Sequence, residues 1–324
     1  MRPRDVQSRK DGDTVWRAIF ACSMGGMALA ANAEFSFEDD GARLTVVENG
    51  QQVLVYNYGP VDAPKGVPER YRRACYIHPL YGLDGEVMTD DFPLDHRHHR
   101  GLYWAWPETT IGDKRADIWA CGGIYQRHEA WTAKEAGADK AVVGTRNFWS
   151  YADAPDVGVG REDVVYTIHA ATDQGRIIDV AFKFTNITEE IVTFLGATGK
   201  GYGGFNFRPP MTRRPHVFTT KDGLLEKDAL RYETPWTDIT SQPESGPVSG
   251  AAIFQYPGNP GYPHHGWIMR HYSFLGVCWP HLEAYPVKPG ESFELRYRLY
   301  LHRGTAEEAG VVKAFAAYTA SATE

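Results

Sequence analysis

Cysteine is scarce in this chain, with four among 324 residues. Cys75, Cys121 and Cys278 lie far apart in the sequence, so none of them forms the Cys-x-x-Cys pair of a local zinc knuckle. Three cysteines also allow at most one internal disulfide. We expect them to be buried apolar thiols.

The chain also lacks an excess of positive charge and long apolar runs. The net charge is −7 and the isoelectric point is about 6.0, so the chain has no general attraction for nucleic acid or anionic membranes, which leaves open a local basic pocket. After residue 33, no segment is long and apolar enough to span a bilayer as a helix. The sequence also lacks internal repeats and the Gly-x-Ser-x-Gly motif of serine hydrolases. We therefore expect neither a nucleic-acid partner nor a membrane span.

The first 33 residues have the pattern of a signal peptide. Arg17 precedes a mainly apolar stretch over residues 18–30, and Ala31-Asn32-Ala33 supplies the small-x-small pattern of a cleavage site. Two aspartates in the charged region are untypical, which leaves a misassigned start codon as an alternative, and a lipid anchor on Cys22 is another. We expect cleavage near Ala33 and export to the periplasm or the cell exterior.

The remaining sequence is typical of β-structure. With 33 glycines, 20 prolines, 18 tyrosines and 9 tryptophans, it favours turns and aromatic-rich strands. Asn49-Gly50 between two apolar segments predicts a hairpin, and residues 177–186 and 191–197 predict a strand pair. Residues 305–318 predict a helix with Thr305 as its N-cap. The fold class expected is all-β: a large antiparallel β-sandwich with a short C-terminal helix, residues 34–324 forming one domain.

The most unusual stretch is Asp95-His96-Arg97-His98-His99-Arg100-Gly101. Three imidazoles, two guanidiniums and a carboxylate within six consecutive residues need partners when buried, so they indicate a polar pocket. If the stretch is a strand, His96 and His98 face one side of it and His99 faces the other.

Three interpretations of the histidines stay open. In the first, imidazoles act as general acid or base without a metal, and the catalytic candidates are His78, His98, His99, Glu129 and His281. In the second, a divalent metal ion is the cofactor, held by Asp95, His96 and His98. In the third, the side chains form a hydrogen-bonded structural network.

Arginines and aromatic residues supply candidates for substrate binding. An arginine grips a carboxylate with two parallel hydrogen bonds, and an aromatic ring stacks on the apolar face of a sugar. Surface ion pairing and core packing are the alternative roles for these residue types. Glycines between Gly199 and Gly204 either let backbone pass close to a ligand or mark bulges. The candidates are Arg100, Trp104, Trp106, Tyr202, Arg208, Trp267 and Arg270.

Four motifs carry a resemblance to a known family. They are Tyr76-Ile77-His78-Pro79-Leu80-Tyr81, the stretch 95–106, Gly201-Tyr202-Gly203-Gly204-Phe205 with Arg208, and the stretch 295–304. Over residues 34–304 the sequence resembles an uncharacterised family of mostly secreted bacterial proteins often labelled "methane oxygenase PmoA". That label implies an integral membrane subunit, which a chain without a spanning helix does not match. The family is frequently found near polysaccharide-utilisation genes, which implies work on carbohydrates.

A second, looser resemblance concerns the end of the chain. Pro289-Gly290-Glu291, followed by an alternating strand that ends at His302, is similar to the end of aldose-epimerase-like β-supersandwich proteins. This resemblance implies a large sandwich that binds sugar on a concave face, where His and acidic side chains transfer protons.

The resulting hypothesis is an exported carbohydrate-active enzyme for a sugar or a uronate-containing oligosaccharide. The reaction is either β-elimination, with arginines neutralising the uronate, or hydrolysis by paired carboxylates from Glu86, Asp90, Asp91 and Glu129. A non-catalytic glycan-binding sandwich and a metal-dependent enzyme are the alternatives. We expect one shared cavity, lined by His78, His99, Arg100 and Arg208.

Overall fold

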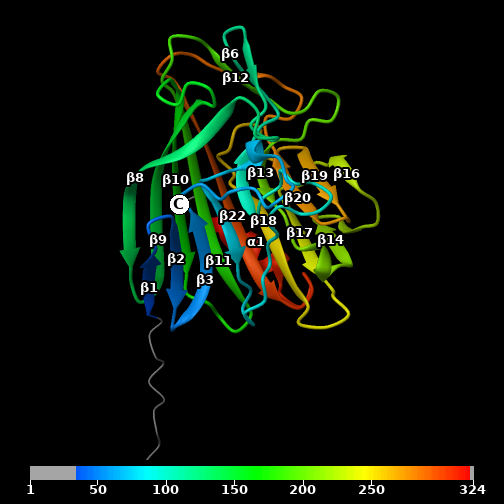
Figure 1. Ribbon diagram of the computed structural model, residues 1–324. Coiled ribbons are helices and arrows are strands. Elements are labelled where there is room, and N and C mark those ends of the chain that lie inside the picture. The colour runs from blue at the N-terminus through cyan, green and yellow to red at the C-terminus, as the bar shows by residue number, and fades with distance from the viewer. Residues whose placement is uncertain (1–33, 322–324) are drawn as a thin grey trace, which may run out of the picture. The chain divides into compact units, whose positions relative to one another are not determined.

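The computed structural model describes residues 34–321. The predicted signal peptide and its Cys22 lie outside these residues. Within them, strands form three antiparallel sheets of nine, nine and four strands (Figure 1). The prediction of an all-β sandwich-like fold with a short C-terminal helix is confirmed.

The first sheet has the strand order β1-β2-β3-β4-β5-β13-β20-β19-β16. Its N-terminal hairpin forms as predicted, since Asn49 and Gly50 both adopt positive φ and Glu48 pairs with Gln51. The strands are β1 (Phe35–Asp39), β2 (Arg43–Glu48), β3 (Gln51–Asn57), β4 (Tyr76–Leu80), β5 (Leu102–Ala105), β13 (Gly204–Phe207), β16 (Ala229–Arg231), β19 (Gly266–Arg270) and β20 (Phe274–Cys278).

The second sheet has the order β15-β14-β17-β18-β22-β11-β10-β9-β8. Five of its strands are twelve or thirteen residues long, and most of them bury alternate side chains, as the sequence alternation predicts. The strands are β8 (Ile124–Ala136), β9 (Lys140–Tyr151), β10 (Gly158–His169), β11 (Gly175–Asn186), β14 (His216–Thr220), β15 (Gly223–Leu225), β17 (Trp236–Ser241), β18 (Ser249–Gln255) and β22 (Ser292–Arg303).

The small sheet has the order β21-β12-β6-β7, with strands β6 (Glu108–Ile111), β7 (Lys114–Ala116), β12 (Val192–Leu195) and β21 (Tyr285–Val287). It corrects one prediction, because β12 pairs with β6 and β21 and not with β11. The Asn186 side chain donates to the carbonyls of Glu190 and Val287 at 2.8 Å, which fixes the chain as it leaves the second sheet. Short 3-10 turns lie at η1 (Glu69–Tyr71) and η2 (Met211–Arg213).

The two large sheets pack face to face through aromatic side chains. The ring of Trp104 in β5 lies 4.2 Å from that of Phe182 in β11, and Phe205 in β13 stacks on Tyr297 in β22 at 5.3 Å. Burial of such rings supplies most of the favourable energy of a core. The three cysteines at 75, 121 and 278 are free and buried, as expected.

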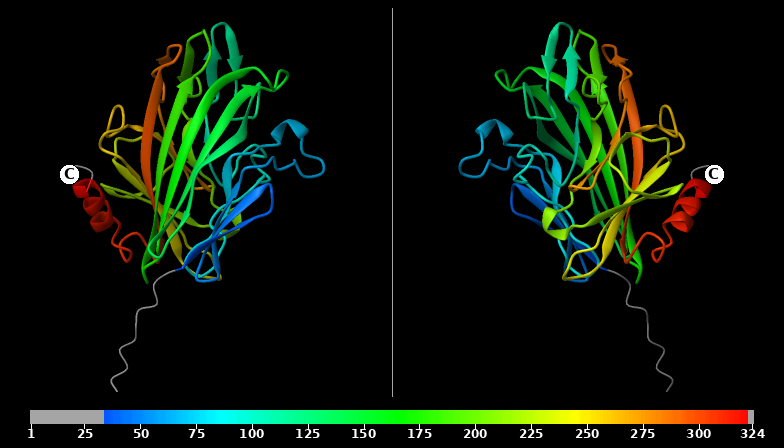
Figure 2. Two further views of the ribbon diagram at one scale, coloured as in Figure 1. Left: turned by 90° about the vertical axis from the view of Figure 1, so that its left-hand side faces the viewer. Right: turned by 90° about the vertical axis from the view of Figure 1, so that its right-hand side faces the viewer.

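Helix α1 (Val311–Ser321) packs on the second sheet through a separate cluster that includes Phe254 and Tyr300 (Figure 2). The prediction of this helix is confirmed, but its start is wrong. Thr305 and Glu308 do form a reciprocal capping pair, since the Thr305 N–H donates to Glu308 Oε2 at 2.8 Å. Gly310 then adopts a φ of 64°, which interrupts the turn, so the regular helix begins at Val311.

Candidate functional site

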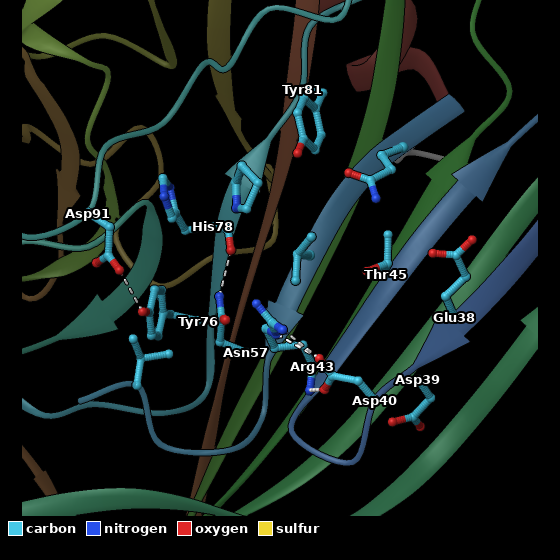
Figure 3. A pocket seen from close by; sticks show the side chains of 14 residues that line it. Glu38, Asp39, Asp40, Arg43, Thr45, Asn57, Tyr76, His78, Tyr81 and Asp91 are labelled. Carbon is cyan, nitrogen blue, oxygen red and sulfur yellow. Dashed lines mark hydrogen bonds and ion pairs between the residues drawn. The ribbon is translucent and has the colours of Figure 1, made fainter. Parts of the chain in front are cut away.

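A cavity of about 520 Å³ lies against the first four strands, and we call it the β1–β4 cavity (Figure 3). Leu44, Val46 and Ile77 from these strands are fully buried in the core, whereas their neighbours Thr45 and His78 line the cavity. The cavity therefore lies on the outer face of the sheet. Its lining consists of Glu38, Asp39, Asp40, Arg43, Thr45, Gln52, Val55, Asn57, Val61, Tyr76, His78, Pro79, Tyr81 and Asp91.

His78 in β4 has a fixed ring orientation. Its Nδ1 lies 3.0 Å from Thr89 Oγ1, which also accepts the N–H of Leu80 at 3.0 Å. Burial, and secondly the charge of Arg100, lowers the pKa of His78 to about 4. The imidazole is therefore neutral above that pH, with Nε2 available to a ligand.

Asp91 has the opposite shift. Burial raises the pKa of this carboxyl to about 6, against the opposing effects of the Arg100 charge and the Tyr76 hydroxyl. The Tyr76 hydroxyl donates to Asp91 Oδ2 at 2.9 Å, and Arg100 Nε lies 3.4 Å from Oδ1. A carboxyl that protonates near pH 6 beside a neutral imidazole is the kind of pair that acid–base catalysis requires.

The other charges of the β1–β4 cavity are mostly acidic. Asp40 pairs with Arg43 at 2.7 Å, and Asp39 accepts a hydrogen bond from Tyr58 at 2.6 Å. Arg43 is the single basic residue among the lining residues, against four carboxylates. This balance favours a neutral polyhydroxylated ligand over an anionic one.

The stretch 95–101 is a loop and not a strand. We call it the 95–101 loop. The separation of His99 from the other two imidazoles, expected if the stretch were a strand, therefore does not occur. The His99 ring lies 4.6 Å from both His96 and His98, and His96 also stacks on Tyr272 at 5.2 Å.

Several polar atoms of the 95–101 loop are hydrogen-bonded to neighbouring residues. Arg208 Nη2 donates to Asp95 Oδ1 at 2.6 Å, and Arg208 Nη1 lies 3.4 Å from His99 Nδ1. Trp119 donates its indole N–H to His98 Nε2 at 3.0 Å. Burial lowers the pKa of His98 to about 3 and that of His99 well below its usual range, so both rings are neutral. These contacts form a structural network.

The predicted metal ligands Asp95, His96 and His98 are not arranged as a metal site. Nowhere between residues 34 and 321 do three His, Cys, Asp or Glu side chains group as ligands of one ion. His98 Nε2 is occupied by Trp119, and Asp95 Oδ2 lies 3.0 Å from His96 Nδ1. The second interpretation of the histidines therefore has no geometric support.

Both central arginines are buried and paired with carboxylates of the protein. Arg100 packs on the ring of Phe92 at 3.5 Å and donates to the His99 carbonyl at 2.7 Å, while its Nε faces Asp91. Arg208 is fully buried against Asp95. Of the four residues expected to share one cavity, only His78 lines the β1–β4 cavity.

The remaining candidates lie elsewhere, and none of them lines this cavity. Trp104, Trp106 and Trp267 are core residues with at most 1% exposure, so their faces are covered by protein. Glu129 is exposed and pairs with Arg161 at 3.2 Å. Tyr202 packs on Trp119 at 4.8 Å.

The last two candidates, Arg270 and His281, contact residues at or next to β16, the edge strand of the first sheet opposite β1. The glycine-rich stretch contacts His281. Arg270 lies 3.6 Å from Asp228, and His281 is buried with Nε2 3.2 Å from the Leu230 carbonyl. Gly201 adopts a φ of 75°, and a Cβ there would lie 2.2 Å from His281. The close approach that the glycines permit is thus to protein and not to a ligand.

The lining residues from β1 to β3 were missed by the sequence analysis. Glu38, Thr45 and Asn57 alternate with apolar residues on their strands, a pattern that any solvated sheet face shares. What distinguishes them is the position of the 81–91 segment, which brings Asp91 to the same cavity. The sequence offers no signal for that contact.

Fold and site together give an all-β protein with a polar cavity that His78 and Asp91 both line. The chain belongs to a family of unknown function, DUF6807, whose model matches residues 43–316. No curated protein matches it. No helix in the described part of the chain has the length and apolar character needed to cross a membrane.

Three solved structures are similar in part. The galactosidase domain of an alpha-galactosidase-sucrose kinase matches at 11% identity and a TM-score of 0.41, over 85% of this chain and 40% of that one. A polysaccharide lyase matches at 13% identity and a TM-score of 0.31, over 85% and 33%. A galactose 1-epimerase from Lactobacillus acidophilus NCFM matches at 10% identity and a TM-score of 0.30, over 83% and 93%. This chain spans less than half the length of the first two. All three TM-scores are below 0.5, so function has to be argued from the residues of this chain.

Proposed function

We propose that this protein is an exported carbohydrate-active enzyme that binds a sugar in the β1–β4 cavity. Asp91 acts as the general acid and neutral His78 as the general base. The observation that carries the proposal is this pair, with opposite pKa shifts, on the wall of one polar cavity.

The composition of the cavity supports a sugar. Each sugar hydroxyl both donates and accepts, and the lining offers carboxylate acceptors, the amides of Asn57 and Gln52, and the hydroxyl of Thr45. The partly exposed ring of Tyr81 offers a flat face for sugar C–H groups.

The same lining favours hydrolysis or another acid–base reaction over β-elimination. Elimination from a uronate needs a cation that neutralises the carboxylate. Arg43 already pairs with Asp40, and Arg100 lies behind Asp91, so neither is available for this task. A reacting sugar without a carboxylate therefore fits the cavity better.

Incubation of the purified protein with a broad panel of neutral and acidic glycans tests the proposal. We expect products whose mass reports the addition of water or an unchanged composition, without the ultraviolet absorbance of an unsaturated uronate. Replacement of His78 by Ala or Asp91 by Asn should abolish most of the turnover. The matched control is His271→Ala, because this imidazole pairs with Asp228 at 2.8 Å away from the cavity lining.

Saturable binding without turnover would leave a glycan-binding sandwich in place of an enzyme. Turnover that survives in both cavity variants would place the reaction elsewhere in the protein.

A further inference from the structure

A second cavity, of about 650 Å³, lies beside the segment that follows β3. We call it the arginine cavity. Its lining comprises Tyr58, Gly59, Pro60, Glu69, Arg70, Arg72, Arg73, Ala74, Tyr125, Gln126, Arg127, His128 and Ala152. Four arginines face a single carboxylate, the reverse of the balance in the β1–β4 cavity.

Most of this positive charge is not neutralised by the protein. Arg72 alone among the four makes an ion pair within the described residues, with Asp62 at 2.9 Å, and both side chains are largely exposed. Arg70 donates to the Tyr71 hydroxyl at 3.0 Å, and Arg127 donates to the Pro155 carbonyl at 2.9 Å. Neither contact removes charge from the cavity.

Arg73 is the most informative of the four. It is 5% exposed, and its Nη2 donates to the Ile118 carbonyl at 2.5 Å. Its Nη1 is buried without any hydrogen-bond partner among residues 34–321. A buried guanidinium N–H without an acceptor is costly, so an acceptor from outside the chain fits this position.

The nearest buried carboxylate does not fill that role. Glu162 accepts hydrogen bonds from Gln126 at 2.9 Å, Asn147 at 2.7 Å and Trp149 at 2.8 Å, and it makes no ion pair with Arg73. Three neutral donors satisfy the hydrogen-bonding capacity of this carboxylate, so it acts on Arg73 through its charge alone and gives Arg73 Nη1 no acceptor.

We propose that the arginine cavity is an oxyanion-binding subsite, and that it takes the carboxylate of an acidic sugar residue. The planar fork of arginine matches a carboxylate with two parallel hydrogen bonds, and several arginines around one cavity raise the local concentration of anions. The binding of an oxyanion is inferred from the arginines alone. The assignment of that oxyanion to a sugar rests on the proposed function.

The two cavities lie on either side of one short segment. Asn57 and Val61 line the β1–β4 cavity, whereas Tyr58, Gly59 and Pro60 between them line the arginine cavity. The Tyr58 hydroxyl donates to Asp39 Oδ1 at 2.6 Å across this boundary. The acidic lining of the β1–β4 cavity repels a carboxylate, and the arginine cavity attracts it. A glycan that spans both cavities therefore binds in one direction, with a neutral sugar at His78 and an acidic sugar beside Arg73.

Calorimetric titration with a short oligogalacturonate and with a neutral galacto-oligosaccharide of equal length tests the inference. We expect the wild-type protein to bind the acidic ligand at least about tenfold more tightly, with a preference that shrinks as salt rises. The double variant Arg70→Gln/Arg127→Gln should lose this preference. These two side chains are accessible enough to change without disturbing the core, and Arg146→Gln, on β9 and paired with Asp163, is the matched control.

Titration with inorganic phosphate and sulfate identifies the source of the oxyanion. Phosphate binding that the double variant abolishes, without binding of the oligogalacturonate, would overturn the assignment to a sugar acid. Equal affinity for acidic and neutral ligands in wild type and variant would overturn the subsite itself. Neither result touches the proposed function, which is decided by His78-dependent turnover of a neutral glycan.

Discussion

The 95–101 loop and the β1–β4 cavity both combine histidine, aspartate and arginine, yet they use these side chains differently. In the loop, Asp95 accepts from Arg208 and His98 accepts from Trp119, so both side chains have partners within the protein. In the cavity, the His78 ring makes a single side-chain hydrogen bond, through Nδ1, and Asp91 accepts from the Tyr76 hydroxyl while its Oδ1 lies 3.4 Å from Arg100 Nε. A dense polar motif can thus be a structural element, while the pair that we propose as catalytic lines a cavity with fewer polar neighbours.

The largest expected effect is on catalysis at His78. Replacement of His78 by Ala should lower kcat/KM on the glycan substrate about 10²–10⁴-fold, the usual contribution of a general acid or base. The fold should be retained, because the ring makes one side-chain hydrogen bond. Steady-state kinetics and circular dichroism on the same preparation check both statements, and an unchanged kcat/KM would remove His78 from the mechanism.

Arg208→Ala should have the largest effect on stability. The substitution leaves Asp95 and the His99 ring without their buried partner, which we expect to lower the free energy of unfolding by about 3 kcal/mol. Urea denaturation measures it. The double variant Arg208→Ala/Asp95→Ala serves as control and should recover part of the loss, since no unpaired carboxylate remains. A loss that the double variant merely increases would contradict a structural ion pair.

The pH dependence of turnover should be bell-shaped. The base His78 must be neutral, which requires a pH above about 4, and the acid Asp91 must be protonated, which requires a pH below about 6. Because each pH unit beyond a limb costs about tenfold, kcat/KM at pH 8 should be about 100-fold below its maximum. A profile that rises through pH 6 would instead make Asp91 the base.

The smallest expected effect comes from His98→Ala. This change removes the acceptor of the Trp119 indole N–H, so the free energy of unfolding should fall by about 1–2 kcal/mol. Turnover per folded molecule should stay within about twofold of wild type, since the ring lies outside the β1–β4 cavity. Thermal denaturation and kinetics on the same sample measure the two. A loss of activity as large as that of His78→Ala would return the active site to the 95–101 loop.

Local sequence signals predict the strands well and their partners less well. Asn49-Gly50 forms its turn because both residues tolerate positive φ, and the alternation of Phe293 to Leu299 matches the burial of β22. The predicted pairing of β11 with β12 fails because the Asn186 side chain diverts the chain into the small sheet. The bond to Val287 joins residues far apart in the sequence, and hydrophobic periodicity does not report such a contact.

The site was harder to predict for a related reason. Composition shows which residues are polar. It does not show whether a polar residue has its partner within the chain, as Asp95 has in Arg208. His78 and Asp91 were among the residues named in advance, but their association depends on how the 81–91 segment folds back on β4. The sequence analysis did not single out the arginines at positions 70, 72 and 73, and the missing partner of Arg73 Nη1 emerges only from the structure.

The most direct test of the central claim is nitrogen-detected NMR of the imidazoles during titration with a glycan that the protein binds. We predict that the ring signals of His78 shift with ligand and titrate near pH 4 in the free protein, while those of His98 and His99 stay unchanged. Ligand-induced shifts at His98 and His99 with a silent His78 would contradict the account and place the sugar at the 95–101 loop.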